Sequence, residues 1–315
     1  MEGLRIAHVL RFMAELTRLT GYPVPAPPGF ASWWSRGLKL KREGSPRLLF
    51  TGALYQLVPY INSTVRLLEV LESRGLSFLL ESLRELAIRR PAALSGLVRP
   101  NGGEVEESVR ILRSIVALLL RSGIDFAYDP EVSDMYSGAL LLDYGLRDSL
   151  EEHARRVIDA INSTGASEII TVDPHTALTL MIYRERYGLR AEVRSYLELV
   201  RPARSWLSDV VTVHDSCIYA RDLNLWLRVR DLLKEAGIKF VEPRNHGTRT
   251  FCCGGPVEAL SPRLSGYIAG RRLSELRKAS RTVVTMCPIC LSNLRRASTG
   301  DVKIVDLALA INSDD

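Results

Sequence analysis

Apolar residues in the first fifty positions change from a helical spacing to a compact run. The helical stripe consists of Ile6, Val9, Leu10, Met13 and Leu16. This spacing predicts an amphipathic helix that ends at Gly21. The prolines between residues 23 and 28 predict an extended connector, whose aromatic end, Trp33 and Trp34, is expected to pack on the main body. Residues 1–47 are therefore predicted to form an N-terminal helix and a proline-rich connector.

Short apolar runs beyond this connector predict buried strands that alternate with helices. The predicted strands lie at residues 48–50, 168–172, 210–213, 238–241 and 281–286. Helical spacing is found around residues 65–71 and 225–236, and Gly237 stands where a helix C-cap is expected. Strands that alternate with helices favour an α/β fold with mainly parallel sheets and helices on both faces.

A similar sequence pattern occurs twice along the chain. The run from Glu168 to Pro174 parallels the run from Arg281 to Pro288, and both lead into a helix. Tyr136 precedes Cys252 by 116 positions, and Asp173 precedes Cys287 by 114. We therefore predict two similar Rossmann-like halves related by internal duplication. These cover residues 48–204 and 205–315, with a helical insertion in the first half near residues 76–120.

Composition and length agree with a folded protein of this size. The chain has 315 residues, 46% hydrophobic and 25% charged, which is typical of a soluble globular protein with one large or two ordinary domains. The longest apolar runs, such as Ile115 to Leu120, are too short to cross a bilayer. Charged residues interrupt the apolar pattern of the N-terminus, unlike a secretory signal. We therefore expect a cytoplasmic protein.

The net charge of +6 arises from basic residues spread along the chain, often as pairs such as Arg271 and Arg272. We interpret these pairs as solvated helix faces. Binding to nucleic acid would favour a concentrated basic stripe with aromatic residues, and only the stretch from Lys39 to Arg47 approaches one. Nucleic-acid binding is kept as an alternative, and the main prediction includes no nucleic acid partner.

The candidate chemistry lies in five cysteines, all in the last third of the chain. They are Cys217, Cys252, Cys253, Cys287 and Cys290. The carboxyl ends of parallel strands meet at one edge of a sheet, so thiols that follow strands are expected to converge there. An odd number of thiols in a reducing compartment argues against disulfides. A structural zinc ion needs four ligands and leaves one thiol over, whereas an iron–sulfur cluster can use a larger set.

The pattern Cys217, Cys252-Cys253-Gly254 and Cys287-Pro288-Ile289-Cys290 resembles the cysteine-rich CCG domain found in heterodisulfide reductases. Related domains occur in glycolate, lactate, glycerol-3-phosphate and succinate oxidoreductase complexes. The resemblance implies that all five cysteines bind a non-cubane [4Fe-4S] cluster. It also implies an iron–sulfur subunit that exchanges electrons with a disulfide, a thiol or a quinone.

The same resemblance implies partners that bring the electrons. The chain has no ferredoxin-type run of four cysteines, so a ferredoxin-like or flavoprotein oxidoreductase subunit is expected beside it. Membrane contact is expected only through such a partner, and the isolated chain is expected to lack activity if the partner is required. The alternative is a zinc-stabilised scaffold or interaction subunit without redox activity.

The first half resembles a CCG domain that has lost its thiols. Thr51-Gly52-Ala53, Tyr136-Ser137-Gly138 and Asp173-Pro174-His175-Thr176 stand at the positions of the three cysteine motifs. We interpret this half as a retained scaffold. A separate metal site at Asp173 and His175 is the alternative.

His214 is the candidate catalytic residue, because it lies three positions before Cys217. Its imidazole is suited to donate a hydrogen bond to a cluster sulfur or a proton to a substrate thiolate, and packing against the strand end is the alternative. Arg244, His246 and Arg249 precede the cysteine pair and would frame an anionic substrate or an acidic partner, unless they belong to a solvated loop.

Overall fold

Two parallel sheets form the framework of the protein. The computed structural model describes residues 2–73, 85 and 98–312. The first sheet has the order β1-β2-β3, with bounds Arg47–Phe50, Glu168–Thr171 and Glu192–Ser195. The second has the order β5-β4-β6-β7, with bounds Phe240–Val241, Val211–Val213, Thr282–Thr285 and Lys303–Asp306. All strand pairs are parallel, which confirms the predicted α/β class.

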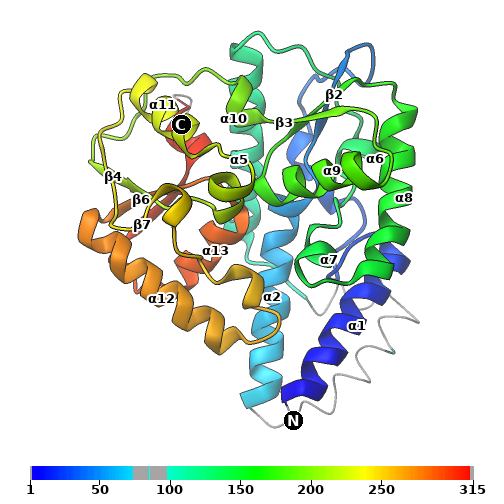
Figure 1. Ribbon diagram of the computed structural model, residues 1–315, viewed down its shortest axis with the longest axis horizontal. Helices are drawn as coiled ribbons and strands as arrows, with labels where there is room; N and C mark the ends of the chain where they lie inside the picture. The colour runs from blue at the N-terminus through cyan, green and yellow to red at the C-terminus, as the bar shows by residue number, and fades with distance from the viewer. Residues whose placement is uncertain (1, 74–84, 86–97, 313–315) are drawn as a thin grey trace.

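Helices cover and connect these sheets (Figure 1). The first half contains α1 (Glu2–Thr20), η1 (Phe30–Ser35), α2 (Leu54–Ser73), α5 (Gly102–Arg121), α6 (Pro130–Ser133), α7 (Ala139–Asp143), α8 (Arg147–Ser163), α9 (Pro174–Arg186) and α10 (Tyr196–Leu199). The second contains η2 (Ile218–Asp222), α11 (Trp226–Glu235), η3 (Gly247–Arg249), η4 (Gly255–Val257), α12 (Pro262–Ala279), α13 (Pro288–Ala297) and α14 (Leu307–Ala310). Within the described part of the chain, no helix is both long enough and apolar enough to cross a membrane.

Local patterns predicted several of these elements and missed others. The N-terminal stripe forms α1, and the helix predicted at residues 225–236 is α11, which Gly237 follows in the left-handed conformation with φ of 76°. The helix expected at residues 65–71 begins earlier, at Leu54. Strands β3 and β7 were not predicted, because each lies at a sheet edge and contains charged residues. The insertion predicted near residues 76–120 includes α5, but residues 74–84 and 86–97 lie outside the described residues.

The two sheets share an order of elements. β1-β2-β3 in the first sheet matches β4-β6-β7 in the second, and α9 follows β2 as α13 follows β6. An internal duplication would produce this shared order of strands and helices, although the duplication itself stays a prediction. The predicted boundary between residues 204 and 205 falls in the loop between α10 and β4, and it also stays a prediction.

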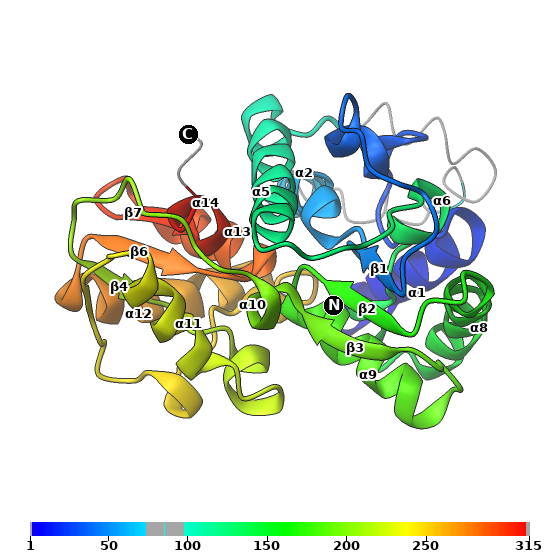
Figure 2. The same cartoon turned by 90° about the horizontal axis from the view of Figure 1, so that it is seen from above.

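The largest hydrophobic core runs through both halves. It contains Leu49 and Ile170 from the first sheet, Val213 and Val284 from the second, and Ile115 from α5. Figure 2 shows the sheets side by side, with α5 and α10 at the junction. Buried apolar surface shared in this way opposes separation of the halves.

Hydrogen bonds reinforce this junction. The hydroxyl of Tyr55 on α2 donates to Oδ2 of Asp306 over 2.8 Å, and the hydroxyl of Ser114 on α5 donates to the carbonyl of Ala308 over 2.8 Å. All four residues are buried, so these hydrogen bonds are protected from water. They help to fix the carboxyl ends of the two sheets relative to each other.

A buried carboxyl group anchors the aromatic end of the connector. Trp34 is 1% exposed, as its predicted packing requires, and its indole Nε1 donates to Oδ1 of Asp134 over 3.2 Å. Thr51 and Gln56 donate to the same oxygen, and the hydroxyl of Tyr128 donates to Oδ2. Burial raises the pKa of Asp134 to about 7 even though these donors oppose the shift.

Acidic side chains neutralise part of the basic stretch from Lys39 to Arg47. Lys41 pairs with Asp125, Arg42 pairs with Asp129 over 2.9 Å, and Arg47 pairs with Glu168 over 2.9 Å. These pairs reduce the positive charge that the stretch can offer to phosphate groups.

The pKa of Asp134 predicts a pH-dependent stability. The folded state keeps a proton on Asp134 up to about pH 7, while the unfolded state loses it near pH 4, so the free energy of unfolding falls as pH rises through this window. The side chain in Asp134→Asn cannot ionise. The free energy of unfolding of this variant should therefore fall by on the order of a few kcal/mol less between pH 4 and pH 7. Urea unfolding at pH 4 to 8 measures this. The exposed Asp159→Asn is the control, and an unchanged slope in Asp134→Asn would contradict the explanation.

Candidate metal centre

Loops at the carboxyl ends of β4 and β6 bring the five cysteines together. Cys217 precedes η2 beyond the end of β4, and Cys252 and Cys253 lie between η3 and η4. Cys287 is the N-cap of α13, directly after β6, and Cys290 lies in its first turn. The described strands and helices thus deliver all five thiols to one end of the second sheet.

The thiols form one continuous row of contacts. Hydrogen bonds join Cys217 to Cys252, Cys252 to Cys253, Cys253 to Cys290 and Cys290 to Cys287. All five are free cysteines, without a disulfide among them. Cys253, Cys287 and Cys290 are buried, whereas Cys217 and Cys252 are half-buried. The group is therefore closed on one side and accessible at the end formed by Cys217 and Cys252.

Proximity separates the pKa values of these thiols. Hydrogen bonds from Cys217 and Cys253 lower the pKa of Cys252. Burial opposes ionisation of Cys287, but hydrogen bonds from Cys290 and His175 outweigh it, so its pKa is also lowered. The pKa values of Cys217, Cys253 and Cys290 are raised, mainly because each thiol bonds to a neighbouring thiol. Thiolates are the form of cysteine that binds metal ions, so this group of thiols is suited to bind cations.

Two glycines shape the turn after the cysteine pair. Gly254 has φ of 81°, and a Cβ there would lie 2.8 Å from the carbonyl oxygen of Ser265. A Cβ on Gly255 would lie 2.1 Å from Cγ2 of Ile289. The backbone N–H groups of these glycines donate to Sγ of Cys252 over 3.3 Å and to Sγ of Cys253 over 3.4 Å. The turn therefore needs glycine both for its conformation and for its close approach to α12 and α13.

His214 lies beside the thiols, with one buried nitrogen unpaired. One ring nitrogen of His214 and the sulfur atoms of Cys253 and Cys290 all lie within 4.8 Å of one another. Arg272 donates from Nε to Nδ1 of His214 over 3.1 Å, and a guanidinium can only donate, so the hydrogen of the neutral ring is on Nε2. Nε2 has no hydrogen-bond partner within the described residues.

The pKa of His214 bears on the two roles predicted for it, and both roles stay predictions. Burial, followed by repulsion from Arg272, lowers its pKa to about 3. The imidazole is therefore neutral at physiological pH and has an N–H to donate, but it does not carry the extra proton of an imidazolium. This favours a hydrogen bond to sulfur over proton delivery to a substrate.

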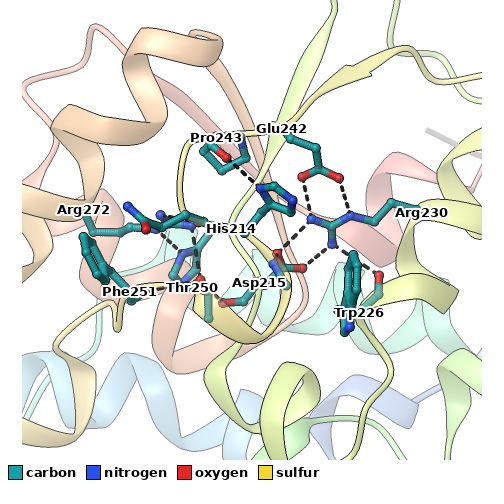
Figure 3. Close-up of polar contacts among 12 residues, drawn as sticks. His214, Asp215, Trp226, Arg230, Glu242, Pro243, Thr250, Phe251 and Arg272 are labelled. Atoms are coloured by element: carbon teal, nitrogen blue, oxygen red, sulfur yellow. Dashed lines mark hydrogen bonds and ion pairs between the residues drawn. The ribbon is translucent and has the colours of Figure 1, made fainter.

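A buried network of charged groups holds His214 in this orientation (Figure 3). Arg272 also donates to Thr250 over 3.2 Å, and the hydroxyl of Thr250 donates to the carbonyl of Asp215 over 3.1 Å. The carboxylate of Asp215 accepts from Arg230, which also binds Glu242 over 2.9 and 2.7 Å. The network thus ties α11 and α12 to the end of β4.

The interpretation of Arg271 and Arg272 as a solvated pair is wrong for Arg272. Its side chain is fully buried, whereas Arg271 is exposed. Sequence spacing could not separate them, because the helical pattern around them is only weakly amphipathic and the partners of Arg272 come from distant loops. The signal that was present is the position of Arg272 next to Leu273 on the buried face of α12.

The basic residues before the cysteine pair lie mainly toward solvent. Arg244 and Arg249 are exposed. His246 is half-buried, and its Nδ1 lies 2.9 Å from the carbonyl oxygen of Pro243. A frame for an anionic substrate at these residues stays a prediction.

The positions of the first half that correspond to Cys253 and Cys290 also lie next to each other, but they carry hydroxyl groups instead of thiols. The hydroxyl of Thr176 donates to that of Ser137 over 3.2 Å, where the second half has Cys290 beside Cys253. A Cβ on Gly52 would lie 2.1 Å from Oγ1 of Thr176, so this site is also tightly closed. Neither Asp173 nor His175 belongs to the group of metal-type donors found within the described residues.

His175 instead reaches the thiols of the other half. His175 and Cys287 lie close enough for each side chain to shift the pKa of the other, and Nδ1 of His175 lies 3.0 Å from Oδ2 of Asp143. The contact with Asp143 is an ion pair whose alignment is too poor for a hydrogen bond. Burial disfavours the imidazolium, but Asp143 and Cys287 outweigh it and raise the pKa of His175. Sequence reasoning missed the proximity of His175 to Cys287, because these residues are 112 positions apart.

Comparison with known protein families identifies the same part of the chain, the parallel α/β domain that holds the five cysteines. The model of the cysteine-rich domain family, CCG, matches residues 211–295, which include all five cysteines. The match agrees with the resemblance that the cysteine motif indicated.

Two curated relatives match more than this domain. A probable membrane-anchored ferredoxin of Chromohalobacter salexigens is 27% identical over 205 residues, covering 59% of this chain and 30% of that protein. A probable iron-sulfur-binding oxidoreductase, FadF, of Bacillus subtilis is 25% identical over 206 residues, covering 61% of this chain and 29% of its own length. Both matches cover more of this chain than the second half contains, so they also include part of the first half. The chain spans less than a third of the length of these relatives.

Solved structures give a weaker comparison. An aspartate racemase of Picrophilus torridus has a TM-score of 0.28 and 10% identity, covering 65% of this chain and 85% of the racemase. An aspartate racemase homologue of Pyrococcus horikoshii has a TM-score of 0.25 and 10% identity, covering 65% and 90%. Scores this low carry no statement about fold or activity.

The burial of Arg272 predicts a large stability difference between neighbouring substitutions. Arg272→Met leaves Nδ1 of His214 and the carbonyl of Asn245 without their donor inside the protein and removes the ion-pair partner of Glu275, at a cost of about 3 kcal/mol or more. Arg271→Met removes only a surface contact with Tyr267 and should change stability by less than about 0.5 kcal/mol. Urea unfolding of the metal-free, reduced protein compares them. Equal losses would contradict the buried network.

Proposed function

We propose that this chain is an iron–sulfur subunit of a heterodisulfide reductase-like oxidoreductase complex. Cys217, Cys252, Cys253, Cys287 and Cys290 would hold a non-cubane [4Fe-4S] cluster. When bound, the cluster supplies one-electron transfer to or from a disulfide, a thiol or a quinone. The observation that carries the proposal is the unbroken row of five free thiols at the end of the second sheet.

The dimensions of the thiol group favour several metal ions over one. In a tetrahedral zinc site with Zn–S bonds of about 2.3 Å, the four sulfur atoms would lie about 3.8 Å apart. Within the described residues, the donors that all lie within 4.8 Å of one another are His214, Cys253 and Cys290, a set with only two sulfurs. A row of five thiols fits a cluster of several irons better than one zinc ion. The names of the two curated relatives, a ferredoxin and an iron-sulfur-binding oxidoreductase, support the same assignment.

The protein's own residues would ligate, orient and shield this centre. The cysteines provide thiolates, and the N–H groups of Gly254 and Gly255 stabilise the negative charge on Cys252 and Cys253. The Nε2–H of His214 is available to a neighbouring sulfur, and Arg272 fixes the ring that carries it.

The half-buried thiols indicate where electrons or substrate would enter. Cys217 and Cys252 are the accessible members of the group, and Phe251 beside them is 55% exposed. A substrate sulfur or a partner surface would approach at this edge, because Cys253, Cys287 and Cys290 are covered. The expected partners are ferredoxin-like or flavoprotein subunits, in the cytoplasm or at a membrane through those subunits.

Metal analysis is the direct test of this proposal. Protein purified without oxygen should contain about four irons per chain and show the broad visible absorbance of an iron–sulfur cluster. A colourless protein with one zinc ion per chain would contradict it and favour the zinc-stabilised scaffold.

Substitution of the central thiol separates the two metals further. Cys253 contacts both Cys252 and Cys290, so Cys253→Ser should lower the iron content and change the visible spectrum. A four-ligand zinc site would keep its ion, because four cysteines remain. Ser137→Ala, at the corresponding position of the first half, is the matched control and should keep full iron content. Equal metal content and spectra in both variants would argue against the cluster.

A further inference from the structure

We propose that an apolar cavity behind the row of five thiols is the binding site of a neutral quinone that accepts electrons from the cluster. The inference rests on the proposed function and deepens it, because it selects one acceptor among the disulfide, the thiol and the quinone. The quinone takes up two electrons, one at a time, and two protons from water, and leaves as a quinol. The flavoprotein or ferredoxin-like partner returns the electrons to the cluster.

The cavity lies where three helices of the first half meet the cysteine motifs of the second. Its volume is about 100 Å³, and apolar atoms form nearly all of its surface. Val9 of α1, Val65 of α2 and Leu140 of α7 line it from the first half. Gly255 and Ile289 line it from the second half. The two halves therefore build this cavity together.

A thin wall separates the cavity from the thiols. The backbone nitrogen of Gly255 lies 3.4 Å from Sγ of Cys253, to which it donates. Ile289 stands between Cys287 and Cys290 in the first turn of α13. Gly255 and Ile289 lie directly against each other, because a Cβ on Gly255 would be 2.1 Å from Cγ2 of Ile289. A ligand in the cavity is thus one layer of residues away from the thiol row.

This wall selects the kind of acceptor. Reductive cleavage of a disulfide at a cluster needs contact between a substrate sulfur and a metal ion, and Gly255 and Ile289 prevent that contact from the cavity side. Electrons, in contrast, cross a gap of one residue layer without a bond between donor and acceptor. A quinone needs no bond to the metal in order to be reduced, so it suits a cavity that is close to the thiols but closed off from them.

Charge on the cavity wall favours a neutral ligand. Among the described residues, no lysine or arginine lines the cavity. Its carboxylates are Asp143, which pairs with His175 over 3.0 Å, and Glu258, which pairs with Arg296. An anion such as a charged thiol or disulfide would lose its hydration here without gaining a cation. The cavity therefore favours an uncharged, apolar redox molecule.

The size of the cavity fits one ring. An apolar cavity of about 150 Å³ is known to bind benzene, and this one has about 100 Å³. Half-buried residues also line it, including Phe12, Leu68 and Pro256, so the cavity extends toward the surface. The ring of a quinone fills the inner part, and its apolar tail leaves through the outer part. An empty apolar cavity lowers stability, so packing alone does not explain this space.

The test fills the cavity from two sides in the full chain. Leu68→Trp on α2 and Ala259→Phe after η4 each enlarge a half-buried residue that lines it. The probe is decylubiquinone, whose fully substituted ring does not add to thiols. Calorimetry in mild detergent measures its affinity for the reduced protein with and without metal. Both variants should raise Kd by at least about tenfold, because the larger side chains occupy the space of the ring.

Leu227→Trp is the matched control. Leu227 lies on α11, is 55% exposed and does not line the cavity, so this variant should bind decylubiquinone as the unmodified protein does. A second measurement uses protein that carries its reduced cluster. Decylubiquinone should restore the visible absorbance of the oxidised cluster, more slowly in Leu68→Trp and Ala259→Phe than in Leu227→Trp. Oxidised glutathione, an anionic disulfide, should not displace the quinone.

Specific outcomes would overturn the inference. These are the absence of binding, an affinity unchanged in both cavity variants, an equal loss in Leu227→Trp, or displacement by oxidised glutathione. Binding without oxidation of the reduced cluster would overturn the role of the quinone as acceptor. A chain without iron would instead contradict the proposed function, while calorimetry on the metal-free protein still decides whether the cavity binds the quinone.

Discussion

The arrangement of five thiols in one row is the constraint on which the rest of this structure depends. Neighbouring thiols cannot all ionise without a cation, because adjacent thiolates repel one another, whereas a thiol beside a thiolate can donate a hydrogen bond to it. The result is a row in which the pKa values of Cys252 and Cys287 are lowered while those of the other three thiols are raised. Such a row is stable only if the backbone around it is rigid.

Rigidity comes from two sources that act on different thiols. At the cysteine pair, Gly254 and Gly255 let the turn approach α12 and α13 closely, and Ser265 on α12 donates to the carbonyl of Gly254 over 2.8 Å. At the end of β4, the network of Arg272, Thr250, Asp215 and Arg230 fixes the loop that leads to Cys217 (Figure 3). Breaking a buried charge network leaves unpaired charges, so this loop is held by a large energetic penalty.

The two halves differ in chemistry although three strands of the second sheet, β4-β6-β7, follow the order of the first sheet. In the first half, Ser137 and Thr176 form the kind of contact that Cys253 and Cys290 form in the second. The first half thus has oxygen donors in a closed site where the second half has soft sulfur ligands. The shared core and the bond between Tyr55 and Asp306 keep the two halves fixed relative to each other.

The sequence alone determined the features that depend on neighbouring residues. Apolar runs at residues 48–50, 168–172 and 281–286 became strands, and the glycines after Cys253 gave its turn, because backbone conformation responds to local sequence. The cysteine spacing likewise indicated the family of residues 211–295. Tertiary structure decided the burial of Arg272 and the proximity of His175 to Cys287. Both depend on which distant groups meet after folding, and a helical pattern gives the face of a residue but not its partner.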